Sequence, residues 1–148
     1  MIRIISANLN GIRSAQKKGF FDWMIRTNAD VICVQETKAQ LDDLSNLHTA
    51  PGEYSSWFEC AAKRGYSGVA LFSKTQPLHI EYGTGNAEFD AEGRMITAEF
   101  DNTLISSIYF PSGTTGDVRQ EAKYRFLNHF DTLLTRFKQR NKQIILPD

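Results

Sequence analysis

The sequence has few cysteines, no long apolar run and no net charge, and each absence argues against a class of protein. Two cysteines, Cys33 and Cys60, are too few for a disulfide scaffold, and their apolar or aromatic surroundings are typical of small buried residues. No apolar run approaches the ~20 residues of a membrane span. The amino terminus enters a strand-like run at once, unlike a signal peptide. We therefore expect a cytoplasmic protein without a membrane partner.

The charge is evenly balanced, with 17 basic and 17 acidic residues. A basic excess would indicate nucleic-acid binding, and its absence leaves open a basic patch on one face. The local clusters at 17–18 and 136–142 are typical of solubilising surface charge. With 148 residues, no repeats and no linker, the chain is expected to form a single domain over residues 1–148.

The order of apolar patterns predicts a mixed α/β (α+β) fold. A strand over 2–7, a helix over 15–27 and a buried strand over 31–35 form a β-α-β unit. Further strands are expected at 56–60, 66–73, 78–82, 94–100, 103–110 and 142–146, with short helical structure within 37–53 and a long helix over 118–140. This order favours a mixed β-sheet with helices on one face. The other face would then be uncovered, which predicts self-association.

Two polar residues follow the strands of the β-α-β unit. Asn8 comes directly after the strand expected over 2–7, and Glu36 after the strand over 31–35. Parallel strands joined by a helical crossover bring their carboxyl ends to one edge of the sheet, so we expect the two side chains to be neighbours. A carboxylate beside an amide suits a hard cation such as Mg²⁺, and a metal-dependent enzyme is the first hypothesis.

Tyr109 and Asp148 also end strand candidates. Two carboxylates, an amide and a phenol can hold a metal ion and a phosphate, with the metal polarising a water molecule and the phenol donating to a phosphate oxygen. Each residue type also has an ordinary structural interpretation. A Glu after a strand is often solvated, an Asn often caps a turn, and a Tyr often packs half-buried. Spacing alone therefore leaves the metal site a hypothesis.

Four strings occur in a fixed order along the chain: Ser6-Ala-Asn-Leu-Asn-Gly-Ile-Arg13, Val34-Gln-Glu-Thr-Lys38, Gly65-Tyr-Ser-Gly-Val-Ala-Leu71 and Tyr109-Phe-Pro-Ser-Gly113. With these strings the chain resembles the exodeoxyribonuclease III family of apurinic/apyrimidinic endonucleases, within the endonuclease/exonuclease/phosphatase superfamily. The resemblance implies a four-layer αββα sandwich, two mixed sheets face to face with helices outside. This chain would be its N-terminal half, because family members are considerably longer.

The resemblance also implies an activity. It implies Mg²⁺ (or Mn²⁺)-dependent cleavage of double-stranded DNA on the 5′ side of abasic sites. It further implies 3′-to-5′ exonuclease and 3′-phosphatase activity at the 3′ ends of DNA, and a role in base excision repair.

The matched motifs assign roles to particular residues. Glu36 would be a metal ligand, Asn8 would orient or join that metal site, and Tyr109 would bind the scissile phosphate. Asp148 would orient or deprotonate the attacking water. The implied DNA contacts are Tyr66, Arg94 and Asn10.

The chain departs from the family pattern at its last motif. Leu146-Pro147-Asp148 stands where the family has Gly-Asp-x-Asn, and proline fixes φ and removes an N–H. A later Asp ligand and an Asp-His pair have no counterpart, and no histidine falls in a matching motif. We therefore expect the second sheet to be largely absent and this chain alone to be inactive or severely impaired.

Two other functions stay open at this point. A non-catalytic half domain would bind DNA or a partner protein without turnover. Another enzyme of the superfamily would hydrolyse a phosphoinositide or sphingolipid and would share the Asn and Glu positions. The strings that begin at Gly65 and Tyr109 favour the DNA enzymes over the lipid enzymes.

Overall fold

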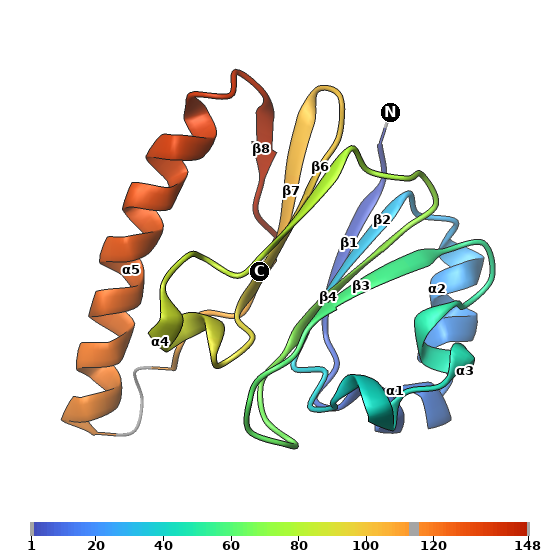
Figure 1. The fold of residues 1–148 in the computed structure, drawn as a ribbon. Coiled ribbons are helices and arrows are strands. Elements are labelled where there is room, and N and C mark those ends of the chain that lie inside the picture. The colour runs from blue at the N-terminus through green and yellow to red at the C-terminus, as the bar shows by residue number, and fades with distance from the viewer. Residues whose placement is uncertain (1, 113–115, 148) are drawn as a thin grey trace.

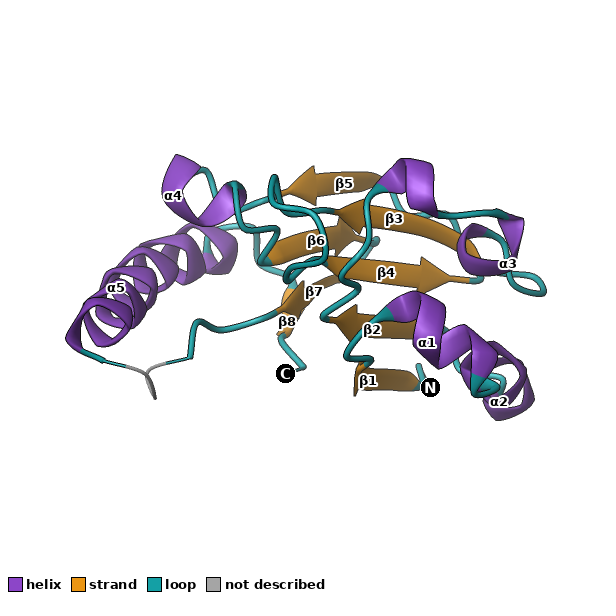
Figure 2. Ribbon diagram, turned by 90° about the horizontal axis from the view of Figure 1, so that it is seen from below, coloured by secondary structure: helices purple, strands orange, loops and turns teal. Residues whose placement is uncertain are grey.

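Two four-stranded β-sheets lie face to face in the computed structural model, which describes residues 2–112 and 116–147. Helices cover the outer face of each sheet, so the chain forms four layers (Figure 1). The same layers are seen end-on in Figure 2, where the long helix α5 and the helix pair α1–α2 lie on opposite sides of the strands. The site described below lies where the two sheets meet at one end.

The first sheet, sheet A, has the strand order β1-β2-β4-β3. Its strands are β1 (Ile4–Asn8), β2 (Val31–Gln35), β3 (Ser55–Glu59) and β4 (Val69–Ser73). The pair β1 and β2 is parallel, as predicted, and the other pairs are antiparallel. The crossover between β1 and β2 contains α1 (Ile12–Lys17) and α2 (Phe20–Thr27), followed after β2 by η1 (Leu41–Asp43) and α3 (Asn46–Thr49).

The crossover differs from the single helix predicted over 15–27. Gly19 interrupts it with φ 90°, a left-handed conformation that favours glycine over residues with a side chain. The chain therefore forms two helices, and the apolar side chains Phe21 and Met24 of the second one are buried against sheet A.

The second sheet, sheet B, has the order β5-β6-β7-β8. Its strands are β5 (His79–Tyr82), β6 (Met95–Glu99), β7 (Thr103–Ile108) and β8 (Gln143–Ile145), with β7 and β8 parallel. A short helix, α4 (Ala87–Asp90), was not predicted, and α5 (Asp117–Lys138) covers the outer face of the sheet. Because β7 and β8 are parallel, the long helix α5 is the crossover that their geometry requires.

The core has three apolar layers, and the alternation of side chains along β2 shows how they arise. Val31 and Cys33 point to the space between the sheets, whereas Ile32 and Val34 point to the helices of sheet A. Both faces of β2 are thus buried, which explains its continuous apolar run. A third layer lies between sheet B and α5 and contains Leu104 among others.

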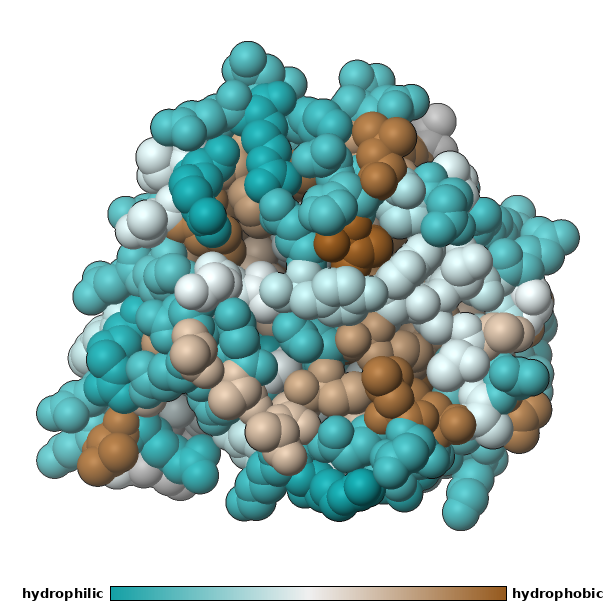
Figure 3. Space-filling model, in the orientation of Figure 1, coloured by the Kyte–Doolittle hydropathy of each residue, from teal (hydrophilic) through white to brown (hydrophobic). Residues whose placement is uncertain are grey.

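The structure confirms the four-layer arrangement, with helices on one face of each sheet. The expectation that the second sheet is largely absent is wrong, since sheet B has four strands. The prediction of self-association was based on an uncovered sheet face, and that basis is removed because sheet B covers the inner face of sheet A. On the face drawn in Figure 3, apolar side chains form separate patches among hydrophilic ones. Within the described residues, no helix is both long and apolar enough to cross a membrane.

The two sheets also approach closely through backbone at Gly93, just before β6. Gly93 has φ 58°, and a Cβ at this position would lie 2.7 Å from the backbone of Glu59, Cys60 and Ala61. The neighbouring Ala62 N–H donates to the Ala91 carbonyl at 2.7 Å. A side chain at position 93 would therefore push the end of β3 away from sheet B.

Substitution of Gly93 tests this contact. We expect Gly93→Ala to lower the free energy of unfolding by about 3 kcal/mol, from the left-handed backbone and the clash together. Gly85 has φ 87° and no atom within 4 Å of its would-be Cβ, so it is the matched control. Gly85→Ala should cost about 1 kcal/mol. Urea denaturation measures both values, and equal losses would contradict the close approach.

Glu59, the last residue of β3, makes stability depend on pH. Burial and, second, the Asp90 carboxylate raise the pKa of Glu59 to about 7. The folded chain therefore binds a proton at Glu59 more tightly than the unfolded chain does. This tighter binding stabilises the fold fully at a pH below the ordinary carboxyl pKa, and the contribution is lost as the pH rises through about 7. We expect the free energy of unfolding to fall by about 1 kcal/mol from about pH 5 to 8, a figure lowered because Glu59 is partly exposed. Glu59→Gln should abolish this loss, and Glu53→Gln, on an exposed residue, should retain it.

Candidate active site

Asn8 and Glu36 meet at the carboxyl ends of β1 and β2, as the β-α-β pattern predicts. The strand register pairs Asn8 with Gln35, and Asn8 Nδ2 donates to Glu36 Oε1 at 2.8 Å. Beyond the strands the two loops remain joined by backbone hydrogen bonds, among them Gly11 N to Glu36 O at 2.8 Å and Ile12 N to Thr37 O at 2.9 Å. The position of the Glu36 carboxylate is therefore set by the backbone of both loops.

The backbone of these loops is strained. Asn10, Glu36 and Lys38 all have left-handed conformations, with φ of 47°, 53° and 51°. For residues with a side chain, such conformations cost on the order of 1 kcal/mol each and persist only where the surroundings impose them. Three of them in two adjoining loops mark this end of sheet A as a candidate functional site.

Asn8 orients the Glu36 carboxylate. Its Oδ1 accepts from the Asn10 N–H at 3.0 Å, and because a backbone N–H can only donate, this contact assigns the amide oxygen. The amide nitrogen is then left to face Glu36. The role of Asn8 as a metal ligand stays a prediction, since its oxygen is engaged by Asn10 in this arrangement.

Lys38 is a residue of the site that the sequence reasoning did not assign, although it belongs to the Val34–Lys38 string. Its Nζ lies 3.3 Å from Glu36 Oε2 and 2.5 Å from Asn10 Oδ1. Burial by itself would raise the pKa of Glu36. Hydrogen bonds from Asn8 and Lys38, the Lys38 charge and a hydrogen bond from Tyr109 outweigh burial and hold that pKa below its ordinary value. Glu36 is therefore an ionised carboxylate at neutral pH.

Tyr109 approaches the same carboxylate from sheet B, since it directly follows β7 and its phenol lies within reach of the negative charge of Glu36. Burial and the negative charge of Glu36 raise the pKa of the Tyr109 phenol, so it stays a hydrogen-bond donor. Arg94 holds Tyr109 in place. Its Nη1 donates to the Tyr109 carbonyl at 3.1 Å, and its guanidinium lies 5.2 Å from the centre of the Tyr109 ring.

Arg94 also binds Tyr66, through Nη2 to the phenol oxygen at 3.1 Å. Glu92 completes this group, since the Tyr66 hydroxyl donates to it at 2.9 Å and Arg94 Nε at 3.3 Å. Arg94 is only 4% exposed, so it anchors the two tyrosines more than it faces solvent. DNA contacts by Arg94, Tyr66 and Asn10 stay predictions, and Glu92 is a further residue that the sequence did not indicate.

The structure thus brings most of the predicted site residues together. Asn8, Asn10, Glu36 and Tyr109 form one cluster, and Arg94 connects Tyr66 to it. Asp148 lies outside the described residues. Among the residues that are described, no group of three or more His, Cys, Asp and Glu side chains is placed to hold a metal ion. The cluster therefore offers one carboxylate with an amide, an ammonium and a phenol around it.

Comparison with known proteins assigns this arrangement to a family. The model of the Endonuclease/Exonuclease/phosphatase family matches residues 5–146. The exodeoxyribonuclease of Bacillus subtilis is 36% identical over 148 residues, which are 99% of this chain and 58% of that protein. The DNA repair nuclease APEX1 of Danio rerio is 40% identical over 122 residues, 80% of this chain and 39% of that protein.

Solved structures agree with the sequence matches. An AP endonuclease from Archaeoglobus fulgidus has the same fold, with a TM-score of 0.81, 24% identity and coverage of 92% of this chain and 52% of its own. The catalytic domain of Xenopus laevis APE2 has a TM-score of 0.80 at 28% identity, over 98% of this chain and 57% of its own. The chain spans about half the length of such relatives. Its fold, its motifs and the matched family model together show that the chain belongs to the endonuclease/exonuclease/phosphatase family.

Proposed function

We propose that this chain forms the metal- and phosphate-binding wall of a DNA-repair nuclease. The proposed reaction is Mg²⁺ (or Mn²⁺)-dependent hydrolysis of the phosphodiester bond 5′ to an abasic site in double-stranded DNA. Exonuclease and 3′-phosphatase action at 3′ ends belong to the same proposal. The observation that carries it is the ionised Glu36 carboxylate, held in a strained turn by Asn8 and contacted by Tyr109 from the other sheet. The names of the relatives, an exodeoxyribonuclease and a DNA repair nuclease, support the choice of substrate.

The residues present fit a hard divalent cation. Mg²⁺ in phosphate chemistry is typically held by one or two carboxylates together with water and substrate phosphate, so a single Glu36 suffices on the protein side. The Lys38 ammonium stands 3.3 Å from Glu36 Oε2, so a metal ion at this carboxylate would share it with Lys38 or displace the ammonium. The bound metal would supply neutralisation of phosphate charge and polarisation of a water molecule. The Tyr109 hydroxyl is then a donor for a phosphate oxygen.

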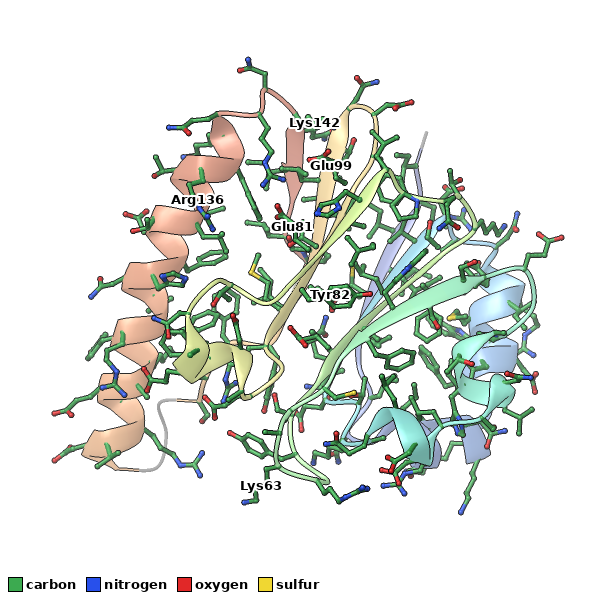
Figure 4. The ribbon with its side chains drawn as sticks, viewed as in Figure 1. Lys63, Glu81, Tyr82, Glu99, Arg136 and Lys142 are labelled. Carbon is green, nitrogen blue, oxygen red and sulfur yellow. The ribbon has the colours of Figure 1, made fainter. Side chains whose placement is uncertain are left out.

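A basic groove adjoins this cluster and suits a DNA backbone. It has a volume of about 480 Å³, and its lining residues are Gly11, Arg13, Ser14, Lys17, Lys38 and Gly65. Lys63 lies at the same end of the molecule (Figure 4), with its Nζ 5.5 Å from the centre of the Tyr66 ring. Cationic side chains beside the cluster would position DNA through its phosphates, without reading its sequence.

The second basic cluster of the sequence, at 136–142, has a different environment. Arg140 pairs with Glu81 at 2.5 Å and with Glu99 at 3.1 Å, and Lys142 lies 3.5 Å from Glu99. Figure 4 shows Glu99 and Lys142 at the end of the molecule opposite Lys63. A groove with basic residues thus adjoins the cluster, whereas Arg140 and Lys142 are paired with acidic residues far from it.

A second candidate function is DNA binding without turnover. The observation that favours it is the single carboxylate of the cluster, with no metal-binding group of three His, Cys, Asp or Glu residues among those described. Such a half domain would hold metal and phosphate without activating water efficiently. The two candidates share Glu36 and the basic groove, and they differ in whether product forms.

An incision assay separates them. A duplex with one abasic site is incubated with the chain and Mg²⁺, and the cleaved strand is resolved by electrophoresis. Product that disappears with EDTA and with Glu36→Gln supports the nuclease. Binding without product supports the half domain for this chain and agrees with the expectation that the chain alone is inactive. Neither binding nor product would contradict both functions.

Metal binding by Glu36 is tested with Mn²⁺, whose free concentration is followed by electron paramagnetic resonance. We expect Glu36→Gln to weaken Mn²⁺ binding by about tenfold or more, because a neutral amide replaces the one carboxylate of the cluster. Glu53→Gln removes the same charge from an exposed residue and should leave the affinity unchanged. Equal affinities of all three proteins would remove Glu36 from the metal site.

The groove is tested with a pair of basic residues. The double variant Arg13→Gln, Lys17→Gln should weaken binding to abasic duplex and reduce the slope of log K against log salt by roughly 2, about one for each lost phosphate contact. Arg136→Gln, Lys138→Gln makes the same change of charge on exposed residues of α5 and is the matched control. Fluorescence anisotropy at several salt concentrations gives both slopes. A loss shared equally by the two double variants would indicate a general charge effect.

A further inference from the structure

We propose that the buried Gln35–Ser107 hydrogen bond is a positioning device that sets how Glu36 and Tyr109 meet. Gln35 ends β2 in sheet A, and Ser107 lies in β7 of sheet B. Describing Glu36 and Tyr109 as parts of an active site rests on the proposed function above. The link from Gln35 to Ser107, between the strands that carry Glu36 and Tyr109, rests on geometry and is independent of that function.

The link between the sheets consists of two hydrogen bonds that share one serine. Gln35 Nε2 donates to Ser107 Oγ at 3.2 Å, and Ser107 Oγ donates to the Val34 carbonyl at 2.8 Å. Gln35 is 3% exposed and Ser107 is completely buried. Ser107 is thus anchored to both the side chain and the backbone of β2.

The Gln35 amide also reaches β1. Its Nε2 lies 3.3 Å from Ser6 Oγ, and its Oε1 lies 3.5 Å from the same oxygen. One amide therefore joins the three strands that end in the site. Ser6 stands two positions before Asn8, Gln35 one before Glu36, and Ser107 two before Tyr109.

Polar bonds at this place have a consequence that apolar packing lacks. The layer between the sheets is mainly apolar, as at Cys33, Leu71 and Ile105, and the other polar bonds between the two halves, such as Ala62 N–H to the Ala91 carbonyl, lie in the loops outside this layer. Apolar contact is not directional, so it holds two sheets together without fixing their offset. A hydrogen bond weakens steeply with distance and angle, and breaking this one would leave a buried amide unsatisfied. Within the apolar layer, the Gln35–Ser107 hydrogen bond therefore constrains the offset of the sheets next to Glu36 and Tyr109.

A double-mutant cycle measures the proposed effect. The free energy of unfolding is determined for the unsubstituted chain, Glu36→Ala, Tyr109→Phe and the double variant, which together give the coupling between the two side chains. The cycle is then repeated in a Gln35→Met background, which preserves side-chain length and removes the amide. We expect a coupling in the natural background and its loss with Met at position 35. A merely structural role would lower all four stabilities and leave the coupling as it was.

Position 107 offers an isosteric pair for the same measurement. Ser107→Thr keeps the hydroxyl and should retain the coupling, whereas Ser107→Val has the same shape without it and should abolish the coupling. The matched control is Thr97→Val. Thr97 and Ser106 form a buried hydroxyl pair at 2.7 Å within sheet B, which does not join the two sheets. Thr97→Val should lower stability and leave the coupling intact.

The outcomes also separate this proposal from the proposed function. Mn²⁺ affinity is measured for the unsubstituted chain and for each variant at position 107. Coupling that depends on Gln35 and Ser107 supports the positioning role even if the chain binds no Mn²⁺, a result that would count against the nuclease. A coupling unchanged in Gln35→Met and Ser107→Val, or equally lost in Thr97→Val, overturns the positioning role whatever the Mn²⁺ affinity.

Discussion

The face-to-face packing of sheet A on sheet B is the interaction on which the candidate site depends. Glu36 and Asn8 come from sheet A, whereas Tyr109 and its anchor Arg94 come from sheet B or the loop before it. The apolar layer between the sheets, which includes Cys33 and Ile105, supplies the attraction. Without it, Glu36 would keep Asn8 and Lys38 as neighbours and lose the phenol. The chemistry of the cluster is therefore a property of the interface between two sheets.

The cluster concentrates conformational strain and charge at that interface. Glu36 and Lys38 both have left-handed backbone and form an ion pair. Burial raises the pKa of Glu36, but hydrogen bonds from Asn8 and Lys38 and the Lys38 charge hold it below its ordinary value. Strained, partly buried and electrostatically perturbed groups are more frequent at functional sites than elsewhere. The ionised carboxylate would attract a divalent metal ion, which would share it with Lys38 or displace the ammonium. Strain, charge and geometry therefore support the same function.

The chain has a local basic surface although its net charge is zero, because the charged residues are unevenly distributed over the fold. Arg13 and Lys17 line a groove beside the cluster, whereas Arg140 and Lys142 are paired with acidic residues at the far end. The net charge of zero therefore gives no information about this basic groove, and the local charge is what attracts a phosphate backbone. The total describes composition, and only the fold assigns each charge to a place.

The sequence by itself determined the β-α-β unit, the meeting of Asn8 with Glu36 and the family. The β-α-β unit follows from local periodicity. The meeting of Asn8 with Glu36 follows from the short helical crossover, which places the two parallel strands side by side, and the family follows from four motifs in a fixed order. Only the tertiary structure decided that the later strands form a second four-stranded sheet, that Arg94 is a buried anchor, and that Gln35 bonds to Ser107. Those features depend on pairs of residues far apart in the chain. Side-chain alternation shows that a strand has an apolar face, but it does not specify which sheet that face will cover.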